Sequence, residues 1–182
     1  MIYYTVPYDT EKNIGVYYNK FMEILPSDSD FGCFVDGDTI FTTPNYGHII
    51  SEAVEKNPEI GCFTCYTNRV KCRSQIAPGV DIQTNDLAYH RNFGSSLQKI
   101  YGSRCKDVTI MTGNQYMSGM FFIIRKSLWK KIGRFPEKKM LGVDNTMHKR
   151  IIEVGEKMFL IEGVYVYHWY RWPNIRDISH LI

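Results

Sequence analysis

The first third of the chain alternates strand-like and helix-like patterns. Residues 2–6 are mostly apolar and are all β-branched or aromatic, as in a short strand. Across residues 14–25, apolar positions recur at steps of three and four residues, which predicts one buried face of a helix. The apolar runs at 31–35 and 60–66 have the length of buried strands, and a second helical pattern separates them. This alternation predicts an α/β fold whose first strands are parallel.

Capping residues indicate where the other helices begin. Thr43 and Pro44 predict the start of the second helix, because a hydroxyl can cap free N–H groups and proline suits the first helical position. Ser127 is expected to cap a short helix over 128–132, and Asp144 to cap a longer one. The remaining segments are predicted, in chain order, as a loop at 68–84, a helix carrying Leu87, Leu97, Ile100 and Tyr101, and strands at 120–124, 158–161 and 164–167.

The composition is that of a soluble globular protein. The chain has 182 residues, of which 44% are hydrophobic and 23% charged, and these proportions exclude disorder as the main state. The length is close to that of one ordinary domain, so we expect a compact single domain over residues 1–182. The net charge of +3 is too small to indicate a nucleic-acid partner.

Neither a membrane span nor a signal peptide is expected. The longest apolar runs, such as 120–124, are far shorter than the roughly 20 residues that cross a bilayer, and residues 1–7 lack a basic start. The five cysteines have no framework-like spacing, so we expect a cytoplasmic protein. Cys62 and Cys65, with Cys72 nearby, have C-x-x-C spacing, but strand alternation places the pair on opposite faces and favours structural thiols over a zinc site.

Asp36 and Asp38 are the clearest candidates for chemistry. They follow the buried run at 31–35 directly and are separated by one glycine, and α/β sheets bind ligands at the carboxyl ends of their strands. Two carboxylates this close can hold Mn²⁺ or Mg²⁺ and leave coordination sites for phosphate oxygens. Asp28 and Asp30 have the same spacing, but they lie in the polar turn before the strand, where we expect them to be solvated.

Several motifs resemble those of GT-A glycosyltransferases, especially the large family 2 group. Phe-Gly-Cys-Phe-Val-Asp-Gly-Asp is similar to the strand and D-x-D of that family, and four later segments are similar to its arginine-ended strand, its glycine turn, its Gly-Glu-Asp motif and its closing strand with histidine. In chain order, the segments that carry the likeness are 31–38, 117–126, 129–137, 141–145 and 165–168. The resemblance implies a GT-A (Rossmann-like) mixed sheet flanked by helices.

The resemblance also implies an activity. This activity is the metal-dependent transfer of a sugar from a nucleoside-diphosphate donor to a glycan or lipid-linked acceptor, and the lipid-linked case is compatible with peripheral membrane association. Asp144 matches the aspartate that serves the family as catalytic base, and in an inverting transfer it would take the proton of the acceptor hydroxyl. His168 matches a histidine that some members use as a further metal ligand. The donor-binding positions implied are Thr5, Pro7, Tyr8, Asp36, Gly37 and Gly119.

Structural alternatives exist for these residues. Asp144 can be a helix cap, His168 a polar strand end, and Gly119 a site of tight sheet packing. Val143 stands where the family usually has glutamate, and only about 30 residues join the first strand to Asp36, where the family has a further helix and strand.

These departures leave a second hypothesis open, a non-catalytic GT-A-like subunit that binds a nucleotide sugar or a glycan. A third interpretation, a zinc or nucleic-acid module, depends on the cysteines and on the aromatic segment 167–172. It ranks last because no basic face accompanies that segment.

Overall fold

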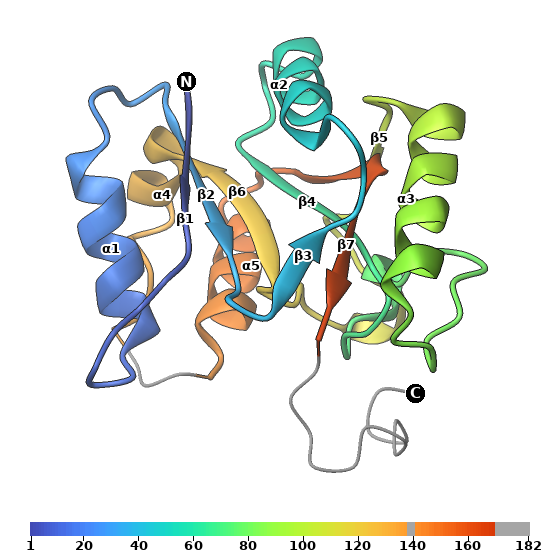
Figure 1. Cartoon of the computed structure of the whole chain (residues 1–182). Helices are drawn as coiled ribbons and strands as arrows, with labels where there is room; N and C mark the ends of the chain where they lie inside the picture. Colours follow the sequence, from blue (N-terminus) through green and yellow to red (C-terminus); the bar gives the residue numbers. More distant parts are fainter. Residues whose placement is uncertain (138–140, 170–182) are drawn as a thin grey trace.

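A mixed sheet of seven strands, flanked by helices, forms the centre of the computed structural model, which describes residues 1–137 and 141–169 (Figure 1). The elements, in chain order, are β1 (Ile2–Thr5), α1 (Ile14–Ile24), β2 (Phe31–Val35), β3 (Thr39–Phe41), α2 (Tyr46–Lys56), β4 (Cys62–Thr67), the 3₁₀ turn η1 (Arg73–Gln75), α3 (Leu87–Tyr101), β5 (Cys105–Asp107), the 3₁₀ turn η2 (Thr112–Asn114), β6 (Phe121–Arg125), α4 (Lys126–Lys131), α5 (Val143–Glu153) and β7 (Met158–His168). Among the helices of these ranges, none is both long and apolar enough to cross a membrane.

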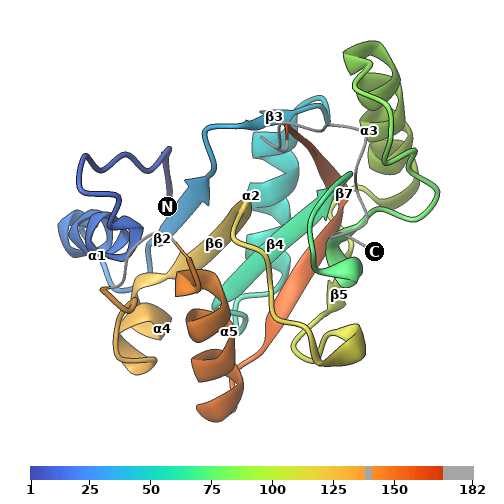
Figure 2. The same cartoon turned by 90° about the horizontal axis from the view of Figure 1, so that it is seen from below.

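The strand order is β1-β2-β6-β4-β7-β3, and β5 pairs with β7. Figure 2 shows the central strands β2, β6, β4 and β7 side by side. β1 and β2 are parallel, as are β4 and β7, whereas β6 lies between β2 and β4 and is antiparallel to both. The predicted α/β class with a mixed sheet is therefore confirmed. The strands predicted in the first third, β1, β2 and β4, run in the same direction as expected, since β6 is antiparallel to both β2 and β4. They do not form one parallel sheet, because β6, a strand from the second half of the chain, separates β2 from β4.

Aromatic side chains fill both faces of the sheet at β2 and β6. Phe34 packs against Tyr18 of α1 and Phe122 of β6, with ring centroids 4.4 and 4.9 Å apart. The next residue along β6, Phe121, points to the opposite face, where it meets Phe41 with a centroid distance of 5.7 Å. All five residues of β2 are buried. This packing makes β2 a rigid support for the acidic pair that follows it.

That residues 1–182 form one domain stays a prediction.

Two predicted helix caps are wrong. α2 is capped by Asn45, a left-handed residue, whereas the Thr43 hydroxyl accepts the N–H of Tyr165 in β7 at 2.8 Å. Ser127 lies inside α4, which Arg125 precedes as N-cap. In both cases no side chain caps the first turn of the helix. A prediction from capping hydroxyls therefore selects the wrong residue.

The two strands predicted at 158–161 and 164–167 form one continuous strand, β7. Its pairing with β4 shifts register between Cys65 and Tyr66, so that Ile161 and Tyr165 are the successive partners. The three residues between these partners are an irregularity of the kind that bends a strand. Both halves of β7 remain in the sheet, and the second half carries His168 to the same edge as the end of β4.

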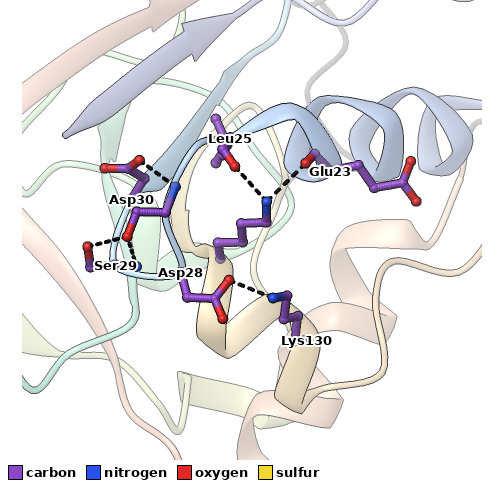
Figure 3. Close-up of polar contacts among 8 residues, drawn as sticks. Glu23, Leu25, Asp28, Ser29, Asp30 and Lys130 are labelled. Atoms are coloured by element: carbon purple, nitrogen blue, oxygen red, sulfur yellow. Dashed lines mark hydrogen bonds and ion pairs between the residues drawn. The ribbon is translucent and has the colours of Figure 1, made fainter.

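The turn between α1 and β2 shows why the two D-x-D sequences differ (Figure 3). Asp28 is exposed and pairs with Lys130 of α4 at 2.6 Å. Asp30 is buried, and its carboxylate accepts the N–H of Ser27 at 3.0 Å. The prediction of a solvated side chain is thus confirmed for Asp28 and wrong for Asp30, which closes the turn.

The cysteines are free thiols in the structure. Cys62 and Cys65 are completely buried in β4, and burial raises the pKa of both thiols. A protonated, enclosed thiol is a poor metal ligand and a poor nucleophile. The absence of zinc in the protein stays a prediction, which elemental analysis can test.

Candidate metal and catalytic site

Several strand ends meet at one edge of the sheet, the lower edge in Figure 1. The parallel strands β1 and β2 end there, as do β4 and β7, and the antiparallel strand β6 begins there. β2 delivers Asp36 to this edge, β7 delivers His168, and the segment before β6 contributes Gly119. Residues far apart in the sequence are therefore brought together by the sheet topology.

Asp36, Asp38 and His168 form a compact cluster at this edge. Each offers one ligand atom, and these atoms all lie within 4.8 Å of one another. The N–H of Asp36 donates to the carbonyl of Met120 at 2.9 Å, which ties the acidic turn to the start of β6. Thr39 closes the turn, because its N–H and its hydroxyl both donate to the carbonyl of Asp36. The turn places Asp38 next to the end of β7.

His168 is buried and held by the residues that follow β4. Its Nδ1 lies 2.7 Å from the carbonyl oxygen of Arg69, which can only accept, so the ring proton is on Nδ1. Its backbone N–H donates to Oδ1 of Asn68 at 2.8 Å. Nε2 is then left facing Asp38, 3.4 Å from Oδ1. Burial disfavours the charged ring, but the interactions with Asp38, the Arg69 backbone and Asp36 together outweigh it, and the pKa of His168 is raised.

The carboxylates crowd one another. Burial raises the pKa of Asp36 to about 6; the charge of His168 opposes this shift, whereas the charges of Asp38 and Asp144 add to it. A divalent cation would relieve this repulsion, because two carboxylates with an imidazole provide the negative charge and the donor atoms that such an ion needs. The donor set therefore fits the Mn²⁺ or Mg²⁺ expected from the sequence.

Asp144 lies on the first turn of α5, beside the cluster. The N-cap of this helix is Gly142, which has a φ of 84°, so the predicted capping role of Asp144 is wrong. Its carboxylate oxygens accept the N–H groups of Gly119 and Asn145, each at 2.8 Å. Burial raises the pKa of Asp144, and the two N–H bonds only partly offset that effect. The result is an oriented carboxylate with a raised affinity for a proton.

Gly119 is required by the close approach of Asp144. A Cβ atom at this position would lie 3.0 Å from Cβ and 3.3 Å from Oδ2 of Asp144. We expect Gly119→Ala to lower the free energy of unfolding by about 1–3 kcal/mol, because the helix or the strand entry must move. Denaturant unfolding measures this change. Gly47→Ala is the control, since Gly47 lies in α2 with nothing within 4 Å of the added atom; equal stability of the two variants would contradict the tight contact.

The remaining predicted donor-binding residues surround the end of β1. The Thr5 hydroxyl lies 2.7 Å from the hydroxyl of an α1 tyrosine, Pro7 is half-buried, and Tyr8 is 77% exposed. A Cβ atom on Gly37 would come within 3.6 Å of Val6, so the end of β1 lies against the D-x-D turn. Their donor contacts stay predictions. Residues 170–172 of the aromatic segment lie outside the described residues.

Three residues near the site were missed. Tyr18, predicted only as part of the apolar face of a helix, is buried. Burial is the main cause that raises the pKa of its hydroxyl, and the charges of Asp36 and Asp144 raise that pKa further. Asn68 and Arg69 are the other two. They follow a buried strand directly, as the acidic pair does, so the rule that singled out Asp36 would have found them.

Both departures from the family pattern are visible in the structure. Val143 is 2% exposed and packs in the core, so no carboxylate takes the place of the usual glutamate. Among the described elements, α1 alone lies between β1 and β2, and these strands are direct neighbours in the sheet.

Fold and site together define an α/β protein that presents an acidic, histidine-containing cluster and a buried carboxylate at the carboxyl edge of its sheet. No protein-family model matches the chain. Its sequence is similar to that of the O-antigen chain rhamnosyltransferase WbaN of Salmonella anatum, with 26% identity over 189 aligned positions. The alignment covers 94% of this chain and 56% of WbaN, so the chain spans little more than half the length of that relative.

Proposed function

We propose that the chain is a glycosyltransferase, which moves a sugar from a nucleoside-diphosphate donor to a glycan or lipid-linked acceptor. The observation that carries this proposal is the convergence of Asp36, Asp38 and His168 at one sheet edge, with the Asp144 carboxylate beside them. The similarity to a protein named as a rhamnosyltransferase supports the same class of activity. The motifs that resemble GT-A enzymes of family 2, together with the mixed α/β sheet, are compatible with it.

Asp36, Asp38 and His168 are the residues that would hold Mn²⁺ or Mg²⁺. When bound, such an ion supplies positive charge that stabilises a departing diphosphate. The protein contributes a fixed imidazole whose Nε2 faces the acidic pair, because the Arg69 carbonyl determines which ring nitrogen carries the proton. It also contributes a buried β2 that keeps the two carboxylates at the sheet edge.

Asp144 is the residue we propose as general base. Each of its oxygens accepts one backbone N–H, and each keeps a further lone pair for the proton of an acceptor hydroxyl. Burial makes the carboxylate more basic than an exposed aspartate, which favours proton transfer in the attack on the anomeric carbon. A base placed in this way corresponds to an inverting transfer.

Thermal stabilisation by donors tests the proposal. A panel of nucleoside diphosphates and sugar nucleotides is added with and without Mn²⁺, because a ligand that binds only the folded state stabilises it, by about 2.7 kcal/mol at a hundred times its Kd. The sugar nucleotide that stabilises most is then incubated with glycan acceptors, and transfer is followed. A panel in which no nucleotide raises the melting temperature would count against the proposed class.

Mn²⁺ affinity should depend on pH. With the pKa of Asp36 at about 6, protons and the cation compete for the same carboxylate as the pH falls. Below that pKa the carboxyl group is neutral and His168, whose pKa is raised, is positively charged, so both residues then oppose binding. We expect affinity to fall at least about tenfold per pH unit below pH 6, since the cation must displace the proton of Asp36 and, where the ring is charged, a second proton from His168. Calorimetric titration with MnCl₂ from pH 7 to pH 5 measures this dependence; a constant affinity would contradict the assignment.

A further inference from the structure

Three consecutive N–H groups before β6 are each donated to a side chain. The bonds are Met117 N–H to His148 Nδ1 at 2.9 Å, Ser118 N–H to Gln75 Oε1 at 2.7 Å, and Gly119 N–H to Asp144 Oδ2 at 2.8 Å. Two of the acceptors are on α5, about one turn apart, and the third is in η1, which follows β4. The strand entry is thus held from two sides by groups distant in sequence.

Gln75 makes the central contact of the three. Its side chain is completely buried, its Oε1 accepts the N–H of Ser118, and its Nε2 donates to the carbonyl of Ser118 at 3.1 Å. The same Nε2 donates to Thr64 Oγ1 at 2.8 Å, and the Thr64 hydroxyl donates to the carbonyl of Phe121. One amide therefore pairs with both backbone groups of Ser118, as a neighbouring strand would.

His148 holds the other end of the segment. It is completely buried, and its Nε2 lies 2.9 Å from the carbonyl oxygen of Thr109, so the ring proton is on Nε2 and Nδ1 is free to accept from Met117. Burial lowers the pKa of this imidazole, consistent with a neutral ring. The position of Gly119 relative to α5 is therefore determined by its neighbours on the N-terminal side.

We infer that Gln75 is a positioning residue for Asp144. Gln75 pairs with Ser118, and this pairing keeps the N–H of Gly119 directed at Oδ2 of Asp144. Gln75 acts through two intervening residues, and its importance for turnover rests on the proposed role of Asp144 as base. Without the amide, the N–H and carbonyl of Ser118 lose their partners and the strand entry can move. Asp144 then loses an orienting bond.

The titration of Asp144 reports this bond. Within residues 1–137 and 141–169, the titratable groups whose charges act together with that of Asp144 are Asp36 beyond β2, Tyr18 on α1 and His148 on α5. All of them are unchanged when Gln75 is replaced. The Gly119 N–H stabilises the ionised carboxylate, so its loss raises the pKa of Asp144 further.

The test compares Gln75→Met with Thr64→Val. Methionine matches glutamine in size but cannot pair with Ser118, whereas the valine variant removes a buried hydrogen bond to the same amide and leaves the Ser118 pairing in place. For Gln75→Met we expect the pKa of Asp144, followed by carbon NMR of its carboxyl group, to rise by about half a unit or more. We also expect roughly tenfold slower turnover and unchanged Mn²⁺ affinity. Thr64→Val should titrate like the parent.

An Asp144 pKa that is the same in Gln75→Met as in the parent, or that shifts equally in Thr64→Val, would overturn the inference. If Gln75→Met does not fold, the backbone amides of the parent protein provide the test. There the Ser118 amide should be protected from exchange, and the Gly119 amide signal should follow the titration of Asp144; an amide that ignores that titration overturns the inference. The proposed function can fail independently of this inference. If Asp144→Asn has full activity, Asp144 is not the base, but the NMR results above still hold.

Discussion

Asp144→Asn is expected to lower sugar transfer by roughly a hundredfold or more, with the fold and the donor affinity preserved. Asparagine has the size of aspartate, and the N-cap residue of α5 is Gly142, so the substitution leaves the cap residue of the helix unchanged. One amide oxygen can still accept an N–H from Gly119 or Asn145, whereas no lone pair of comparable basicity remains for the acceptor proton. The loss should therefore appear in kcat rather than in the Kd of the donor.

Glu153→Gln is the matched control, because it converts an exposed carboxylate on the same helix to an amide. Turnover and donor binding are measured for both variants. Transfer at the parent rate by Asp144→Asn would show that the base lies elsewhere. A parent protein that binds donor with Mn²⁺ but neither transfers nor hydrolyses it, across a broad acceptor panel, would favour the non-catalytic binding subunit. The buried Val143 and the single helix between β1 and β2 would then be the structural features to explain it.

Local patterns were sufficient for the elements whose burial is one-sided or complete. The predicted strand at 31–35 matches β2, all five residues of which are buried, because an apolar run of this length between polar turn residues favours a buried strand. Helix α3 begins at Leu87 and ends at Tyr101, the first and last of its predicted apolar positions. The short strands β3 and β5 have three residues each and no run of apolar side chains. Their pairing with β7 creates them, and no local pattern shows it.

The same distinction applies to the site. Asp36 and Asp38 could be predicted because a buried strand delivers them to a sheet edge. That His168 joins them could be expected only from a family resemblance, because it depends on the pairing of β3, which follows the acidic pair, with the end of β7, where Thr39 lies opposite His168. The contact between Gly119 and Asp144 depends on the packing of α5 against the entry to β6, which no spacing along the chain encodes.

Asp36→Ala and Asp38→Ala should each remove the metal-dependent part of donor binding. A diphosphate approaching the intact carboxylates without a cation meets charge of the same sign, so the ion is what converts this edge into a binding site. Loss of one carboxylate should weaken Mn²⁺ binding by at least the roughly 10–100-fold that loss of an outer-shell partner costs. The stabilising nucleoside diphosphate is titrated with Mn²⁺ and with EDTA into each variant. Asp28→Ala is the control, because Asp28 belongs to the other D-x-D sequence and pairs with Lys130 in the turn before β2. It should bind as the parent does. Diphosphate binding that EDTA leaves unchanged in the parent would rule out the proposed metal role, and the positive charge would have to be sought among the protein's own side chains.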